Sequence, residues 1–122
     1  MSPRIPRAAL LGAVVALATA AAPALAHVQL VKTSPKAGST VKRSVASASV
    51  TYSGPILRGT LSVTGPGGKP ASVDNGARDP RNIDRVLVEL KHGLKAGRYK
   101  ATWKVVAADG HHQQGTFTFR LK

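Results

Sequence analysis

The strongest constraint on the fold is a strict alternation of apolar and polar side chains in residues 98–105, within an expected strand of residues 98–107. A period of two places successive side chains on opposite faces of an extended strand, whereas a helix would need a period of about 3.6 residues. The apolar face carries Tyr99, Ala101, Trp103 and Val105. Shorter segments of similar character recur along the chain between turns rich in glycine and proline. The pattern therefore favours a fold made only of strands.

The expected strands are short and follow one another without a helical segment. They cover residues 28–33, 45–53, 58–64, 71–74, 83–90, 98–107 and 115–121. The polar segment 75–82 contains Pro80 and is expected to be a mobile loop. About seven short strands in so small a chain predict an antiparallel β-sandwich. Trp103, Phe117 and Phe119 are expected in its core.

The first 26 residues have the three parts of a secretory signal peptide. Arg4 and Arg7 supply the positive region, residues 8–22 the apolar region, and Ala24-Leu25-Ala26 the small-residue cleavage site. The apolar region is too short and too rich in alanine for a convincing membrane span, although an uncleaved anchor stays an alternative. We therefore expect residues 1–26 to be removed, leaving residues 27–122 as one secreted domain.

Composition limits the chemistry of that domain. The chain has no cysteine, and its one methionine, Met1, lies in the expected leader. Thiolate and thioether ligands are therefore excluded from the domain, and any metal must be held by His, Asp, Glu or an amine.

Charge is the second compositional feature. With Arg4 and Arg7 removed, 16 of the 18 basic residues and all five acidic residues remain, a formal charge of +11. This charge indicates either attraction to anionic envelope surfaces or simply a well-solvated surface, which we favour because the basic residues are scattered. The few aromatic residues resemble core residues more than stacking platforms, so no nucleic-acid partner is expected.

Cleavage after Ala26 would make His27 the N-terminal residue. Its free α-amine and its imidazole could then bind one metal ion together and close a chelate ring, which an internal histidine cannot do. A neutral amine is required, and its ordinary pKa is about 7.7–8.0, so metal affinity should fall on acidification.

A second cluster is Asp109-Gly110-His111-His112. In an extended segment Asp109 and His111 point the same way, whereas His112 points to the other side. If the first strand runs alongside, the donors would be the His27 amine, the His27 and His111 imidazoles and an Asp109 oxygen. Three nitrogens and one oxygen suit Cu(II) best, with Zn(II) and Ni(II) as competitors. Asp-Gly is also a common turn, and His111 beside it needs no role. His112 and His92 are expected to be surface residues.

The sequence contains no evident catalytic set. No Ser/His/Asp or Cys/His nucleophile arrangement is apparent, and the acidic residues are too few and too scattered for a glycosidase pair. The glycine-rich residues 65–68 lack a following Lys-Ser/Thr and a helix, which argues against a phosphate loop.

Two long motifs resemble the CopC family of periplasmic copper-resistance proteins over nearly the whole of residues 27–122. The first is His27-Val28-Gln29-Leu30 followed by Thr33-Ser34-Pro35-Lys36-Ala37-Gly38-Ser39. The second runs from Leu94 through Gly97, Tyr99, Trp103 and Val105 to Asp109-Gly110-His111, and then to Gly115 and Phe117-Thr118-Phe119. Together the two motifs are specific, whereas either alone would be only suggestive.

The resemblance implies an immunoglobulin-like Greek-key β-sandwich that binds Cu(II) through His27, Asp109 and His111. Relatives with a second, Cu(I) site use a methionine-rich loop that this chain lacks, so it resembles the Cu(II)-only kind. Two positions depart from the family pattern. Gly54 stands where many relatives carry an acidic residue, and His112 replaces the usual proline.

The expected function is that of a monomeric, periplasmic Cu(II)-binding protein that sequesters or carries copper and is not an enzyme. Its expected partners are the copper ion and either an inner-membrane copper transporter or another periplasmic copper protein. One alternative is a copper-dependent oxidative enzyme with a terminal-histidine site, which would leave positions open for oxygen. The other is a basic module that binds anionic envelope surfaces without a metal.

Overall fold

A computed structural model describes residues 27–122 together with Pro3. The expected signal peptide, residues 1–26, and its cleavage site therefore lie outside the described residues apart from Pro3. Among the described residues, no helix has the length and hydropathy needed to cross a membrane.

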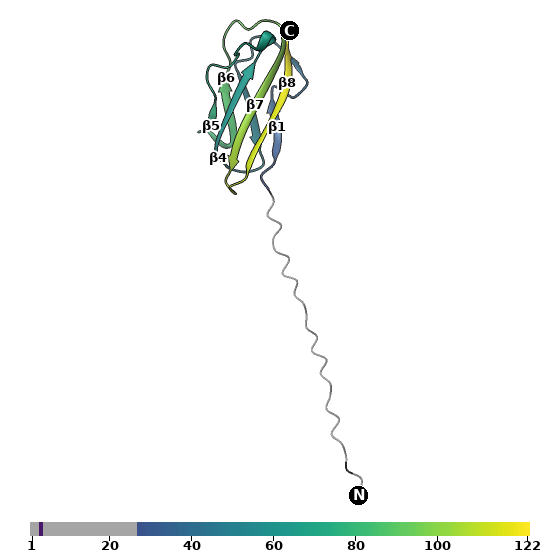
Figure 1. The fold of residues 1–122 in the computed structure, drawn as a ribbon, viewed down its shortest axis with the longest axis vertical. Coiled ribbons are helices and arrows are strands. Elements are labelled where there is room, and N and C mark those ends of the chain that lie inside the picture. The colour runs from purple at the N-terminus through teal and green to yellow at the C-terminus, as the bar shows by residue number, and fades with distance from the viewer. Residues whose placement is uncertain (1–2, 4–26) are drawn as a thin grey trace.

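Residues 27–122 fold into a β-sandwich of eight strands (Figure 1). The strands are β1 (Leu30–Ser34), β2 (Thr40–Val41), β3 (Ser47–Tyr52), β4 (Ile56–Thr64), β5 (Ala77–Asp79), β6 (Asn82–Glu89), β7 (Gly97–Ala107) and β8 (His112–Leu121). A single 3-10 turn, η1 (Pro66–Gly68), follows β4. This architecture confirms the predicted all-β sandwich, with eight strands in place of about seven.

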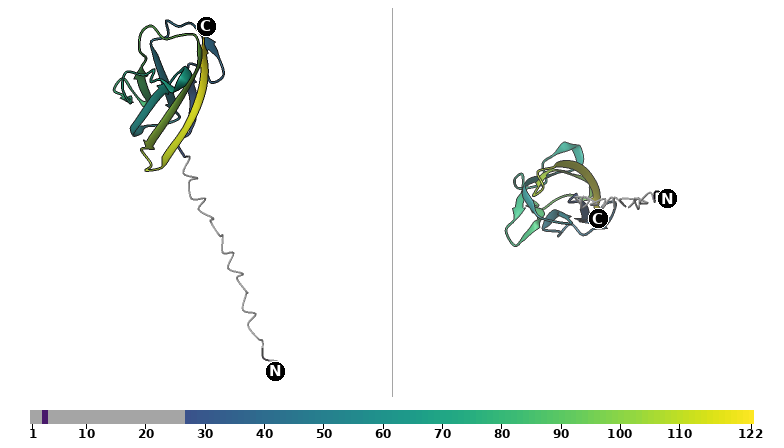
Figure 2. Two further views of the ribbon diagram at one scale, coloured as in Figure 1. Left: turned by 45° about the horizontal axis from the view of Figure 1, so that its top comes forward. Right: turned by 90° about the horizontal axis from the view of Figure 1, so that it is seen from below.

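The strands form two four-stranded sheets, ordered β1-β3-β6-β5 and β2-β8-β7-β4. All pairs are antiparallel except the short pair β2–β8, which is parallel. Two further views show the sheets stacked face to face, with β7 and β8 as the longest ribbons (Figure 2). The β1-β3-β6-β5 sheet and the β2-β8-β7-β4 sheet are named the first and second sheet below.

The core lies between the sheets and follows the alternation of β7. Tyr99, Trp103 and Val105 are buried, whereas Lys100 and Lys104 are exposed. The Trp103 indole N–H donates a hydrogen bond of 2.8 Å to the Tyr52 hydroxyl, which joins the second sheet to β3 of the first. Burial raises the pKa of Tyr52 and the hydrogen bond from Trp103 opposes this rise. The hydroxyl therefore stays neutral in the core.

The structure corrects the expectations for three segments. Residues 71–74 form no strand and make only one bridge, from Ser72 to Leu90. The expected loop 75–82 contains β5, whose Asp79 is buried and accepts a hydrogen bond of 2.6 Å from Arg85. This ion pair allows a charged strand end to pack, which hydrophobic patterning does not reveal. The two-residue strand β2 was also missed.

Candidate metal centre

The turn between β7 and β8 holds two of the expected ligands. The Asp109 Oδ1 atom accepts a hydrogen bond of 3.0 Å from the backbone N–H of His111. Gly110 has a φ of 86°, in the left-handed region that favours glycine. The N–H of Ala107 donates to the His111 carbonyl at 3.0 Å and closes the turn. The Asp-Gly turn and the metal-binding hypothesis are therefore compatible, because the turn itself directs both side chains to one side.

The N-terminal segment is held beside this turn by three hydrogen bonds. Gln29 N donates to Ser53 Oγ at 2.9 Å, and Ser53 N donates to the Gln29 carbonyl at 2.7 Å. From the second sheet, Gln113 Nε2 donates to the Val28 carbonyl at 2.5 Å. His27 directly precedes this tethered segment, so its position is set by both sheets.

Gly54 gives the segment room to pack. A Cβ atom at Gly54 would lie 3.3 Å from Cγ2 of Val28, tighter than ordinary van der Waals contact. The absence of an acidic side chain here therefore has a steric consequence, because it lets Val28 approach the end of β3.

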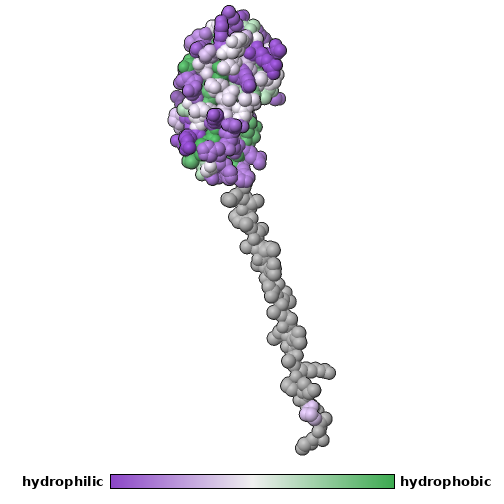
Figure 3. Space-filling model, viewed as in Figure 1, coloured by the Kyte–Doolittle hydropathy of each residue, from purple (hydrophilic) through white to green (hydrophobic). Residues whose placement is uncertain are grey.

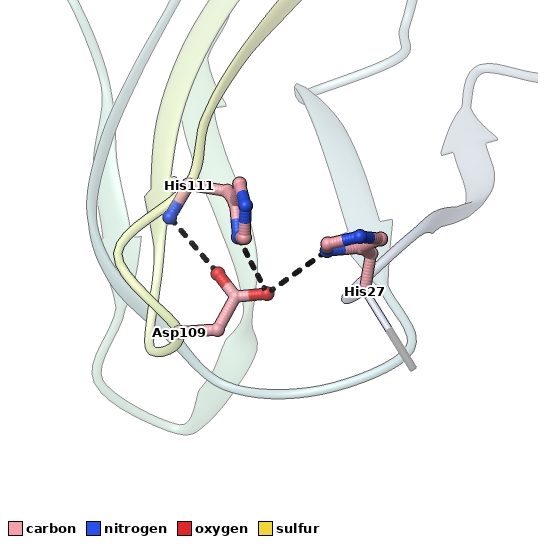
Figure 4. Close-up of side chains that lie close together, drawn as sticks. All are labelled: His27, Asp109 and His111. Carbon is pink, nitrogen blue, oxygen red and sulfur yellow. Dashed lines mark hydrogen bonds and ion pairs between the residues drawn. The ribbon is translucent and has the colours of Figure 1, made fainter. Parts of the chain in front are cut away.

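The three expected side chains converge at one end of the sandwich (Figure 4). The Asp109 Oδ2 atom lies 3.1 Å from His111 Nδ1 and 3.9 Å from His27 Nδ1. The two imidazole rings meet edge to face, with centroids 4.5 Å apart and an angle of 85° between their planes. One donor atom from each residue lies within 4.8 Å of the others.

The cluster is accessible to solvent. The side chains of His27 and His111 are 59% and 54% exposed, and that of Asp109 is 27% exposed. The pKa of Asp109 is lowered mainly by the hydrogen bond from the backbone N–H of His111. Burial acts in the opposite direction, whereas the His111 side chain and the Val28 backbone lower the pKa further. The carboxylate is therefore ionised at neutral pH and presents a negative oxygen to a cation.

The other histidines lie elsewhere. His112 opens β8 and lines a surface hollow with Arg58 and Lys104 on the outer face of the second sheet. His92 lies in the connection between β6 and β7. Neither belongs to the cluster formed among the described residues. The opposite orientation of His111 and His112 follows the alternation expected from the sequence.

The N-terminal segment lies near the β7–β8 turn without any pairing of the first strand with β7 or β8. The strand β1 pairs with β3 in the first sheet, so it does not join the ladder of β7 and β8. Only the segment before β1 reaches across to the β7–β8 turn, through Gln113. Sequence reasoning missed Gln113 and Ser53 as positioning residues, and their polar side chains gave no signal beyond the nearness of Gln113 to His111.

The fold and the cluster together define a β-sandwich with an open His-Asp-His group at one end. Residues 30–122 match the CopC domain, and the chain therefore belongs to the CopC family. The match includes Asp109 and His111 and begins three residues after His27.

The chain is also similar to individual proteins. It is 28% identical over 99 residues to Protein YobA of Escherichia coli (strain K12), covering 80% of each chain. It is 30% identical over 98 residues to copper transport protein CutJ of Bacillus subtilis (strain 168), covering 79% of this chain and 18% of that protein. The crystal structure of CopC from Methylosinus trichosporium OB3b superposes with a TM-score of 0.69 at 22% identity, covering 79% of this chain and 94% of that one. The superposition shows a shared fold.

Proposed function

We propose that the protein binds Cu(II) at the cluster of His27, Asp109 and His111 and serves copper sequestration, transport or resistance in the periplasm. The observation that carries the proposal is the convergence of these side chains from segments that lie far apart in the sequence. Membership of the CopC family and the name of the relative CutJ support copper as the metal.

The donor set fits Cu(II) once residues 1–26 are removed. The free amine of His27 would then join its imidazole, the His111 imidazole and an Asp109 oxygen. Metal–nitrogen bonds of about 2 Å place opposite donors about 4 Å apart, so the observed spread of 4.8 Å needs only a small inward adjustment. Exposed imidazoles can make that adjustment by side-chain rotation. Three nitrogens and one oxygen match the tetragonal preference of Cu(II).

The exposure of the site favours a role in holding and releasing copper. More than half of each histidine side chain is open to solvent, so an incoming ligand from another protein can reach the ion directly. A domain similar to this chain makes up a small part of copper transport protein CutJ. We therefore propose a membrane copper transporter or another periplasmic copper protein as the exchange partner, and a monomer as the active form.

We propose binding and not catalysis because of Asp109. Its ionised carboxylate lies among the nitrogen donors, where it would occupy an equatorial position and stabilise Cu(II) against reduction. A copper-dependent oxidative enzyme would leave such a position open for oxygen. Peroxide-driven oxidation of a polysaccharide by the copper-loaded protein would contradict this assignment.

The test is a Cu(II) titration of residues 27–122, competed against a chelator of known affinity. This segment contains every residue of the sandwich core, so it carries the whole fold. His111→Ala removes one nitrogen donor and should weaken binding by at least ten-fold, the lower end of the effect of losing even a supporting group at a metal site.

The matched control is His92→Ala, which removes an exposed imidazole outside the cluster and should leave affinity unchanged. Equal affinity of His111→Ala and the unaltered protein would contradict the proposed site. The intact mass of the exported protein is a separate test of cleavage, and a start at any residue other than His27 would exclude the amine ligand.

A further inference from the structure

The outer face of the second sheet is basic along its length. Strand pairing sets Arg58 beside Val106 and His112, Thr60 beside Lys104 and Gln114, and Thr64 beside Lys100 and Thr118. The outward-facing cations of this face are Arg58, Arg98, Lys100, Lys104 and Arg120. We call these five residues the basic face.

No acidic side chain interrupts the basic face. The acidic residues of the chain are Asp74, Asp79, Asp84, Glu89 and Asp109, and none lies on β2, β4, β7 or β8. Within residues 27–122, the one ion pair of a lysine or arginine joins Arg85 to Asp79 in the first sheet. The charge of the domain is therefore unevenly distributed between its two sheets.

This arrangement opposes stability. Arg98 and Arg120 are directly opposite each other across β7 and β8, and like charges in that position repel. Arg58, Lys104 and His112 converge around a surface hollow of about 470 Å³. An anionic partner would reduce the repulsion between Arg98 and Arg120 and that between Arg58 and Lys104.

The rest of the face is polar and has few large apolar side chains that could hold a protein partner. Between the cations lie the hydroxyl and amide side chains of Thr60, Ser62, Thr64, Thr102, Gln114, Thr116 and Thr118. Outside the core, the large apolar residues on the long strands of this sheet are the half-buried Val106 and the exposed Leu57 at the irregular start of β4. Figure 3 shows residues of near-neutral hydropathy across the middle of the domain, with strongly hydrophilic residues towards both its upper and its lower end.

We propose that the basic face docks the protein on an anionic phospholipid surface. Protein interfaces are usually anchored by aromatic residues together with arginines, and the aromatic residues of this sheet are all buried in the core, away from the arginines of the basic face. A lipid surface needs only spread positive charge and hydrogen-bond donors for its phosphates, because its headgroups rearrange around the protein. Docking is independent of copper, since the face contains none of the residues of the metal cluster.

The test is co-sedimentation of the protein, with a chelator present, with vesicles of phosphatidylcholine alone or mixed with phosphatidylglycerol. Binding should require the anionic lipid and should be lost in about 1 M salt, where charge interactions reach only about 3 Å. The face variant combines Arg58→Gln, Lys100→Gln and Lys104→Gln. It should bind about 100-fold more weakly, at about five-fold for each cation removed near the surface.

The matched control combines Lys32→Gln, Arg81→Gln and Lys91→Gln, three exposed cations outside the second sheet with the same total charge. Sheets stack about 10 Å apart, so these charges lie about a screening length or more from the lipid, and the control should lose less than about ten-fold. If both variants lost vesicle binding equally, the basic face would not be the docking surface. If the protein did not bind anionic vesicles at all, the docking proposal would be wrong. Binding to poly-glutamate but not to vesicles would also refute it and would indicate an acidic protein partner.

Discussion

The hydrogen bond from Gln113 to the Val28 carbonyl is one of the three that hold the segment after His27, and it is the one that comes from β8; Gln113→Ala removes it. A hydrogen bond of this kind contributes about 0.5–1.5 kcal/mol net. If that free energy serves to hold the N-terminal segment in place, its loss weakens Cu(II) binding by about 2- to 12-fold, at about 1.4 kcal/mol per factor of ten. Binding should be weakened and not abolished, because His27 can still reach the ion once the N-terminal segment has moved into place.

The assay is a competitive Cu(II) titration of residues 27–122, with Gln114→Ala as the matched control. Gln114 is the next residue and faces the outer side of the second sheet beside Lys104, away from Val28. Its truncation should leave copper affinity unchanged. The effect of Gln113→Ala should also become smaller in a His27→Ala background, because the imidazole is then absent and only the terminal amine still depends on the position of this segment. Equal affinity of Gln113→Ala and the unaltered protein, or an effect that is undiminished without the His27 imidazole, would refute the positioning role.

Three further perturbations have expected outcomes. Copper affinity should fall steadily from pH 8 to pH 6, measured by competition titration, because protons compete with the metal for a terminal amine whose ordinary pKa is about 7.7–8.0; a flat profile would contradict ligation by the amine. Gly115→Ala should destabilise the fold by about 1–3 kcal/mol in chemical denaturation, because its Cβ would lie 2.5 Å from Trp103, and unchanged stability would show that the ring moves freely. Asp79→Asn should lower stability at pH 7 and reduce its loss in acid. The pKa of Asp79 is lowered by the backbone N–H of Arg81 and the guanidinium of Arg85, so its contribution is present above the ordinary pKa and is lost as pH falls through the lowered value. An acid unfolding curve that keeps its shape in this variant would contradict the ion pair.

The fold was predictable where hydrophobic patterning is strong. The alternation of β7 identified the buried Trp103 and the exposed Lys104 because both faces of that strand have a single character. Patterning failed for β5, where the strand ends in the buried Asp79, whose charge is paired with Arg85 on the neighbouring strand. It also failed for residues 71–74, which have strand-like composition but make only one bridge.

The candidate site was predictable in part for a similar reason. The orientation of Asp109 and His111 follows from local geometry, because residues two apart in an extended segment share a side. The approach of His27 depends on a side chain of β8 that reaches across to Val28, and no periodicity in the sequence encodes that contact. The prediction that His27 lies near Asp109 and His111 came from the resemblance to the CopC family and from the chemistry of an N-terminal histidine.

The central claim is that Cu(II) is held by the amine and imidazole of His27 together with His111 and Asp109. Electron paramagnetic resonance of the copper-loaded protein tests it most directly, by comparing a chain that begins at His27 with one that retains Ala26 in front. The account predicts coupling to three nitrogens, including the terminal amine, in the chain that begins at His27, and a changed spectrum with weaker binding in the extended chain. Identical spectra from the two chains would contradict it.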